Sequence, residues 1–181
     1  MVELAHELAE AISSRDAVPG SGWVAGLSAG FAAALVAKAA SRSEGWEGAE
    51  GARAQALELR DRLLALAGQD ARAYEQALTA LDRRDSGLQR ALVRAAEVPL
   101  AIAESAADVS LLAAEAAEAA DGAARADASA AAALASGAAR AAVRLVEVNL
   151  LTLQEDERVG RARRAADAAS EAAGRALAAQ P

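Results

Sequence analysis

Asp70 is the carboxylate whose position most strongly indicates chemistry. A helical pattern covers residues 50–81, and within it Leu59, Leu63 and Leu66 recur at coiled-coil spacing. The same apolar stripe, continued by four residues, reaches Asp70. An acid on an apolar stripe is desolvated, which raises its pKa and suits it to donate a proton near neutral pH. The alternative is structural: Asp70 sits where the helix bends outward, or it pairs with a nearby arginine.

Other polar positions carry weaker signals. Asp127 precedes an alanine-rich run, where an aspartate is either a helix N-cap or a functional acid. Asn149 lies beside the apolar seam of the helix predicted over residues 128–152. It is either a buried hydrogen-bonding group or a polar residue at the helix edge. His6 is the only histidine and the chain has no cysteine, so we predict no metal site and no cysteine nucleophile.

A glycine-rich turn, P-G-S-G at residues 19–22, opens an uncharged stretch over residues 17–37. Such a loop before a helix can offer backbone amides to an anion, but an ordinary helix entry needs the same residues. Gly22, Gly26 and Gly30 recur at intervals of four, so another backbone can approach one face closely. The stretch is long enough to span a membrane, yet its small residues and flanking charges favour a packed bundle helix.

Composition places these residues in an all-α protein. Apolar residues make up 54% of the 181 residues and aromatic residues only 2%, so the core is built from small and aliphatic side chains. We predict an antiparallel bundle of about six helices in a single domain over residues 1–181. The predicted helices cover approximately residues 2–14, 23–41, 50–81, 88–120, 128–152 and 155–179.

Charge and termini restrict the class of partner. The net charge of -7 argues against a nucleic-acid-binding surface, which would be basic. The first ten residues hold three glutamates and no lysine or arginine, unlike a signal peptide. We therefore expect a cytoplasmic protein with no membrane segment. The small-residue helix faces favour packing against a second copy, so we expect a homodimer.

Five short motifs, taken in order, resemble those of the cyclodeaminase/cyclohydrolase family. They are P-G-S-G-x-V-A at 19–25, D-A-x-A-Y at 70–74, V-P-L-x-x-A-E at 98–104, A-D at 126–127 and N-L at 149–150. That family includes the C-terminal half of formiminotransferase-cyclodeaminase and stand-alone bacterial methenyltetrahydrofolate cyclohydrolases. The resemblance covers essentially the whole chain, and it implies a dimeric helical domain that binds a tetrahydrofolate derivative.

The chain departs from the family pattern at several polar positions. Trp23 stands where the family has the serine of its glycine loop, and Ala126 stands where it has the serine of an S-D pair. Leu145 replaces the first asparagine of N-V-x-x-N-L, and a G-N pair is replaced by Ala120 and Asp121. These losses leave open the possibility of a catalytically degenerate relative that binds folate or serves as a helical assembly partner.

The resemblance implies one of two related reactions. In the cyclodeaminase reaction, N10 of 5-formiminotetrahydrofolate attacks the formimino carbon, a five-membered ring closes, and ammonia leaves to give 5,10-methenyltetrahydrofolate. In the cyclohydrolase reaction, water attacks the same carbon. No cofactor beyond the tetrahydrofolate substrate is needed, because the substrate supplies both nucleophile and electrophile. A separate formiminotransferase is a further expected partner.

Roles for individual residues follow from the same resemblance. Asp70 is expected to shuttle the proton, and Asp127 is expected to bind the pterin or to assist in proton transfer. Trp23 is expected to stack on a flat ring, unless it fills space at a helix start. The predicted substrate-binding residues are Pro19, Gly20, Ser21, Gly22, Trp23 and Asn149.

Overall fold

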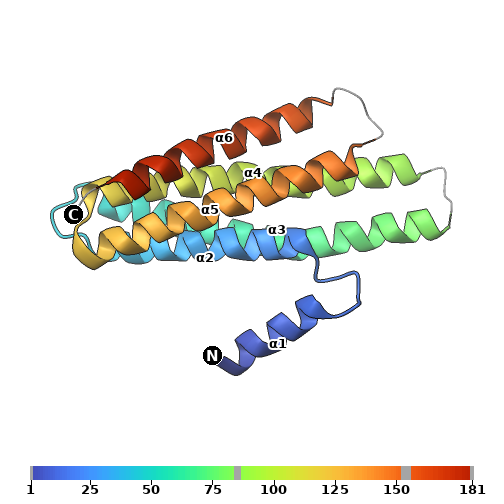
Figure 1. Cartoon of the computed structure of the whole chain (residues 1–181), viewed down its shortest axis with the longest axis horizontal. Coiled ribbons are helices and arrows are strands. Elements are labelled where there is room, and N and C mark those ends of the chain that lie inside the picture. Colours follow the sequence, from blue (N-terminus) through green and yellow to red (C-terminus); the bar gives the residue numbers. More distant parts are fainter. Residues whose placement is uncertain (1, 84–86, 152–155, 180–181) are drawn as a thin grey trace.

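The computed structural model describes residues 2–83, 87–151 and 156–179, and these ranges contain six helices and no strand (Figure 1). The helices are α1 (Val2–Ser13), α2 (Ser21–Arg42), α3 (Ala49–Asp82), α4 (Leu88–Ala119), α5 (Gly122–Asn149) and α6 (Glu157–Ala178). The prediction of an all-α protein is confirmed. The predicted helix boundaries at residues 152 and 155 lie outside the described residues.

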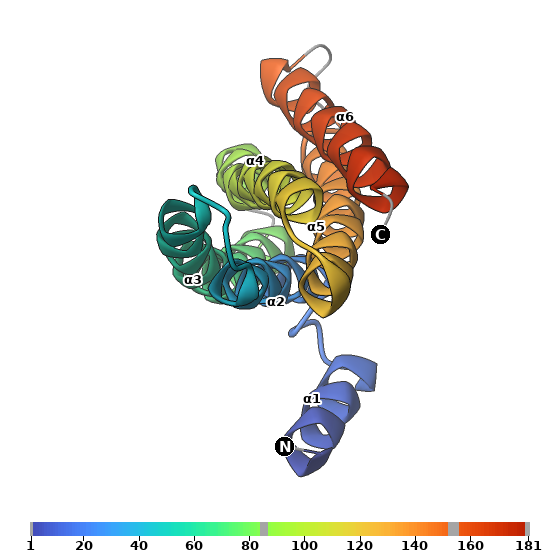
Figure 2. The ribbon, with the colours of Figure 1, turned by 90° about the vertical axis from the view of Figure 1, so that its left-hand side faces the viewer.

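Only α2 to α6 form the bundle, so the prediction that all six helices pack together is wrong for the first of them. α1 contacts none of the other helices and contains no buried residue. Leu4 and Ile12, which lie on its apolar side, are 59% and 43% exposed. Figure 2 shows α1 below the bundle, joined to α2 by a loop. An apolar stripe indicates that a helix has a partner, but it does not identify that partner.

The central helix is α2, which packs against α3, α4 and α5. In the described chain it is the one helix long and apolar enough to cross a membrane, yet 56% of its most apolar window is buried in the bundle. The prediction of a packed bundle helix is therefore confirmed. Its glycine face meets α3, where a Cβ atom at Gly26 would lie 2.9 Å from the Cβ of Ala67 and one at Gly30 would lie 3.0 Å from Cδ2 of Leu64.

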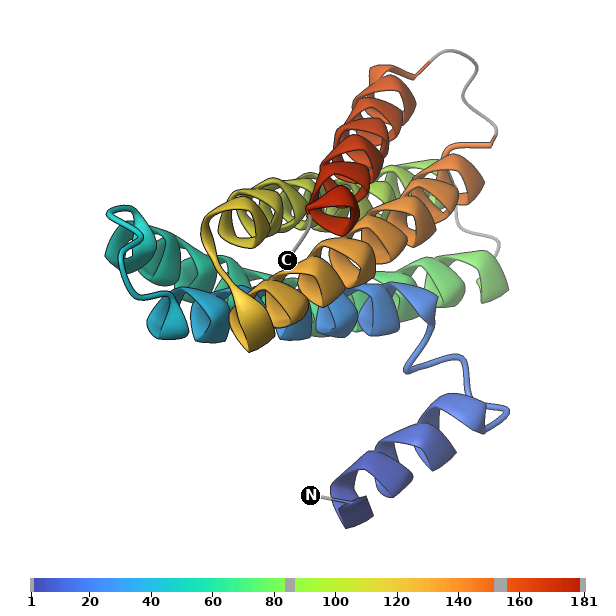
Figure 3. The ribbon, with the colours of Figure 1, turned by 60° about the vertical axis from the view of Figure 1, so that its left-hand side comes forward.

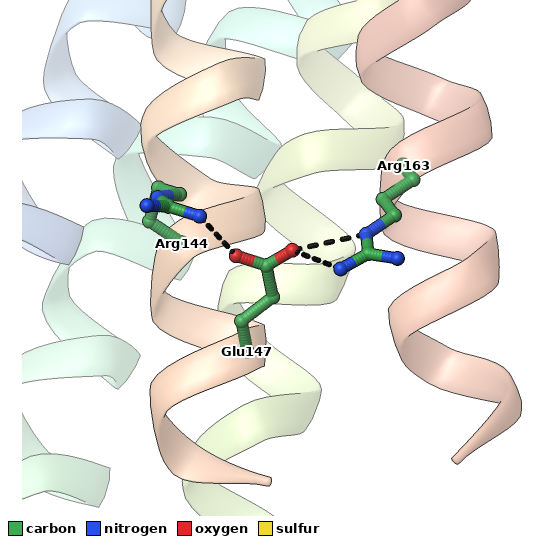
Figure 4. Close-up of polar contacts among 3 residues, drawn as sticks. All are labelled: Arg144, Glu147 and Arg163. Carbon is green, nitrogen blue, oxygen red and sulfur yellow. Dashed lines mark hydrogen bonds and ion pairs between the residues drawn. The ribbon is translucent and has the colours of Figure 1, made fainter. Parts of the chain in front are cut away.

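Polar contacts tie α6 to the other helices. The buried Ser110 hydroxyl on α4 lies 3.1 Å from the carbonyl oxygen of Ala132 on α5 and 2.9 Å from that of Ala169 on α6, and its proton can be donated to either. Nearer the surface, one carboxylate oxygen of Glu147 on α5 accepts two hydrogen bonds from Arg163 on α6 (Figure 4). These arginine bonds hold the pKa of Glu147 below its ordinary value.

We predict that Gly26→Ala destabilises the protein although alanine is the better helix former. The new methyl group would press on Ala67 and force α2 away from α3, a cost of about 1–3 kcal/mol that exceeds the gain of about 1 kcal/mol in helix propensity. The matched control is Gly174→Ala in α6, where a Cβ atom meets nothing within 4 Å and stability should rise. Urea unfolding followed by circular dichroism measures both. Equal stabilisation of the two variants would contradict the close contact.

Candidate functional site

A cavity of about 200 Å³ lies where the start of α2 meets α3, α4 and the end of α5. The start of α2 and the end of α5 are found at the same end of the bundle (Figure 3). The lining residues are Ala17, Val18, Gly20, Ser21, Gly22, Asp70, Tyr74, Ala95, Pro99, Leu145, Val148 and Asn149. Four of the five motif segments thus contribute to one cavity, although they are far apart in the sequence.

Asp70 is the acid of this cavity. Its side chain is half-buried, and burial raises its pKa from the ordinary value of 3.8 to about 6. In the described part of the chain it forms no ion pair, so the predicted alternative of an arginine partner is not observed. The prediction made from the leucine stripe of α3 is confirmed: the next position along that stripe holds a desolvated carboxyl group.

Gly22 makes room for this carboxyl group. A Cβ atom built at Gly22 would overlap the carboxylate of Asp70, so a side chain larger than hydrogen cannot occupy that position without displacing the acid. The carboxyl group consequently lies against the first turn of α2, where Gly20 is the N-cap residue and offers no side-chain cap.

Asn149 and Pro99 form a second polar feature of the cavity wall. Pro99 lies inside α4 and has no N–H group, so the carbonyl of Ala95 loses its usual helical donor. The Asn149 side-chain amide, at the end of α5, donates to that carbonyl at 3.0 Å. Of the two alternatives for Asn149, the structure shows the hydrogen-bonding group, and the same bond fixes the end of α5 against α4 beside the cavity.

Three predicted site residues lie outside the cavity. Trp23 is half-buried on α2 but is not part of the lining, and Pro19 lines a neighbouring groove. Asp127 forms an ion pair at 2.7 Å with Lys38. It lies twenty-two residues before Asn149 on α5, which at 1.5 Å per residue is about 33 Å away. Within a single chain, Asp127 and Asp70 are therefore far apart.

The N-cap interpretation of Asp127 is also wrong. α5 begins at Gly122, with Asp121 as the N-cap residue, so Asp127 lies in the second turn of the helix. Gly122 has a φ of +46°, a left-handed value that glycine adopts at little cost. The chain can therefore enter the helix directly after Asp121, and the alanines that follow extend it.

The cavity is also lined by three residues without a predicted role, Tyr74, Leu145 and Val148. Tyr74 follows Asp70 by one helical turn, so the i, i+4 rule could have placed it beside the acid. Leu145 occupies the position where the family pattern has asparagine, which makes this wall apolar. The cavity thus combines one acid, one phenol, one amide and the hydroxyl of Ser21 with apolar walls, an arrangement suited to a ring with a few polar groups.

Comparison with known proteins identifies the family. A profile of the formiminotransferase-cyclodeaminase family matches residues 5–168. The chain belongs to this family. Among solved structures, it is similar to formiminotetrahydrofolate cyclodeaminase from Thermotoga maritima, with a TM-score of 0.85 and 22% identity over 96% of this chain and 93% of that one. This likeness shows that the two share a fold. A search of curated proteins gave no match.

We predict that Asp70→Asn stabilises the protein at pH 8 and leaves its stability unchanged at pH 3.5. Because the folded-state pKa of about 6 lies above the ordinary 3.8, stability falls as pH rises from about 4 to 6 and the folded acid loses its proton. Asparagine has no charged form, so it avoids this loss, which is on the order of 1–2 kcal/mol once solvent screening of the half-exposed group is allowed for. Urea unfolding at both pH values measures it. A variant less stable than the parent at pH 8 would contradict the desolvation of Asp70.

Proposed function

We propose that this chain is a formiminotetrahydrofolate cyclodeaminase in which Asp70 transfers the proton. The observation that carries the proposal is an acid of raised pKa, without an ion-pair partner in the described chain, in a cavity lined by the family's motif segments. The pKa of about 6 provides both protonation states near neutral pH, as a proton shuttle requires. The name of the Thermotoga maritima relative supports the same reaction.

The proposed mechanism uses one carboxyl group twice. N10 of the substrate attacks the formimino carbon and forms a tetrahedral carbon bonded to N5, N10 and the amino nitrogen. The protonated Asp70 gives its proton to the amino nitrogen, the bond from carbon to that nitrogen breaks, and ammonia leaves. The Asp70 carboxylate then accepts the proton released from N10. The product is 5,10-methenyltetrahydrofolate, and no cofactor beyond the substrate takes part.

Other residues would position the substrate. The apolar walls formed by Pro99 and Leu145 suit the flat face of a ring, and the Tyr74 hydroxyl can bond to a ring nitrogen. The Asn149 amide nitrogen is occupied by Ala95, which leaves its oxygen as an acceptor for a substrate N–H group. The start of α2 would lie against the ligand through three small residues, Gly20, Ser21 and Gly22.

We further propose the cellular setting implied by the family resemblance. The protein would act in the cytoplasm as a homodimer, and a separate formiminotransferase would supply its substrate. The burial of α2 within the bundle supports a protein that does not use this helix to cross a membrane.

We predict that purified protein accelerates formation of the methenyl chromophore from 5-formiminotetrahydrofolate, and that Asp70→Asn lowers kcat about 10²–10⁴-fold because the shuttle is lost. In the parent, kcat/KM should fall as pH rises through about 6, since the proton-donating form is lost there. An absorbance time course measures both. The control is Tyr74→Phe, which keeps the ring and should affect KM more than kcat.

The same assay separates the alternatives. Faster decay of added 5,10-methenyltetrahydrofolate, without formation from the formimino substrate, would establish a cyclohydrolase. Neither change, in protein shown to be helical, would establish a degenerate binder and overturn the proposal. Full turnover by Asp70→Asn would remove Asp70 from the mechanism.

A further inference from the structure

The polar side chains of the Asp70 cavity differ in how freely they change hydrogen-bonding direction. The hydroxyls of Ser21 and Tyr74 can each donate or accept, because a hydroxyl rotates to suit its partner. Asp70 accepts as a carboxylate and donates as an acid, and its pKa of about 6 makes both forms available near neutral pH. Asn149 is the fourth polar side chain of the lining, and its direction is fixed.

A defect in α4 fixes the Asn149 amide. Pro99 has no N–H group, so the carbonyl of Ala95 has no helical donor, and the Asn149 amide nitrogen donates to it at 3.0 Å. The reverse orientation of the amide would set two acceptor oxygens against each other. Ala95 is only 3% exposed, and a buried carbonyl without a donor is costly. The amide orientation therefore belongs to the fold and is in place before any ligand binds.

The oxygen of the Asn149 side chain is left to meet a ligand. None of the described residues donates a hydrogen bond to it. It is not sealed inside the protein either, because the one fully buried side-chain polar atom without a partner, among the residues that the structure describes, is Oγ of Ser105. Asn149 lines the cavity and its nitrogen is turned to α4, so its oxygen is the polar atom that it offers to a ligand.

We propose that Asn149 selects the ligand by polarity: its oxygen accepts an N–H of an amidine group and disfavours a carbonyl group in the same place. This inference rests on the proposed function, in which the ligand carries a formimino group. The formimino group is an amidine with N–H donors, whereas a formyl group of nearly the same size and shape ends in an acceptor oxygen. A ligand oxygen opposite the Asn149 oxygen would leave both without a donor.

The small volume of the cavity brings Asn149 and Asp70 to the same group of the ligand. The cavity holds about 200 Å³, below the roughly 300–1,000 Å³ of most small-molecule sites, so it encloses only part of a folate-sized molecule. In the proposed mechanism Asp70 gives its proton to the amino nitrogen of the tetrahedral carbon. An N–H of that nitrogen directed at Asn149 leaves its lone pair free to take the Asp70 proton. Asn149 thus positions the nitrogen that Asp70 protonates.

The other walls of the cavity cannot make this distinction. An N–H group and an oxygen atom differ little in size, so the apolar walls formed by Pro99 and Leu145 accept both. The hydroxyls and the Asp70 carboxyl group adapt to either ligand. Among the polar side chains of this lining, Asn149 alone has a fixed direction. A site that leaves its own acceptor unpaired binds the wrong ligand more weakly, by about 10-fold or more.

We predict that 5-formiminotetrahydrofolate binds at least about 10-fold more tightly than 5-formyltetrahydrofolate. Isothermal titration calorimetry on Asp70→Asn measures both, because this change blocks the proposed turnover and removes a negative charge that would itself favour a cationic amidine. Adding Asn149→Leu should lower the preference below about 3-fold, whereas adding Asn149→Asp, which keeps an acceptor oxygen, should maintain it. The control is Tyr74→Phe, whose lost hydroxyl can serve either ligand, so the ratio of affinities should not change.

The outcomes separate this inference from the proposed function. Equal affinity for the two ligands, or a preference that Asn149→Leu leaves unchanged, would overturn selection by Asn149 and leave the proposed function standing. Binding of neither ligand, by protein that circular dichroism shows to be folded, would overturn both. The comparison of the two ligands on Asp70→Asn needs no change at Asn149, so it decides the point even where a second substitution unfolds the protein.

Discussion

The close approach of α2 and α3 is the contact on which the candidate site depends. An alanine-rich core has few large side chains, so dense packing requires the helix backbones themselves to come close. Gly26 allows this by leaving space for Ala67. One turn earlier, Gly22 leaves the same kind of space, and there it is filled by the carboxyl group of Asp70. One glycine face therefore both joins two helices and buries the acid.

The corner of the bundle around Asp70 departs from local rules of stability in two ways. A half-buried acid has no ion-pair partner among the described residues, and a proline interrupts the hydrogen bonds of α4. The second departure is repaired by Asn149, which bonds to the carbonyl that Pro99 leaves free. No described residue forms an ion pair that would offset the burial of the Asp70 carboxylate. Costly features that persist in a cavity are typical of functional sites, because substrate rather than protein completes their interactions.

Several apolar positions of the chain are left uncovered by the bundle. α1 has no helix to pack against, Phe31 and Leu134 are exposed, and the cavity is small for a folate-sized ligand. Each of these features alone would mean little, since exposed apolar residues are common. Within one chain, no described helix packs over these positions.

The sequence by itself determined the helices, the glycine face of α2 and the desolvated position of Asp70. All three follow from spacing within one helix, where period and propensity act locally. Only the tertiary structure decided that α1 leaves the bundle, that α5 starts at Gly122, that Trp23 lies outside the cavity and that Asp127 pairs with Lys38 far from Asp70. These outcomes depend on which helices become neighbours, and an alanine-rich sequence offers many faces of nearly equal apolarity from which packing must choose.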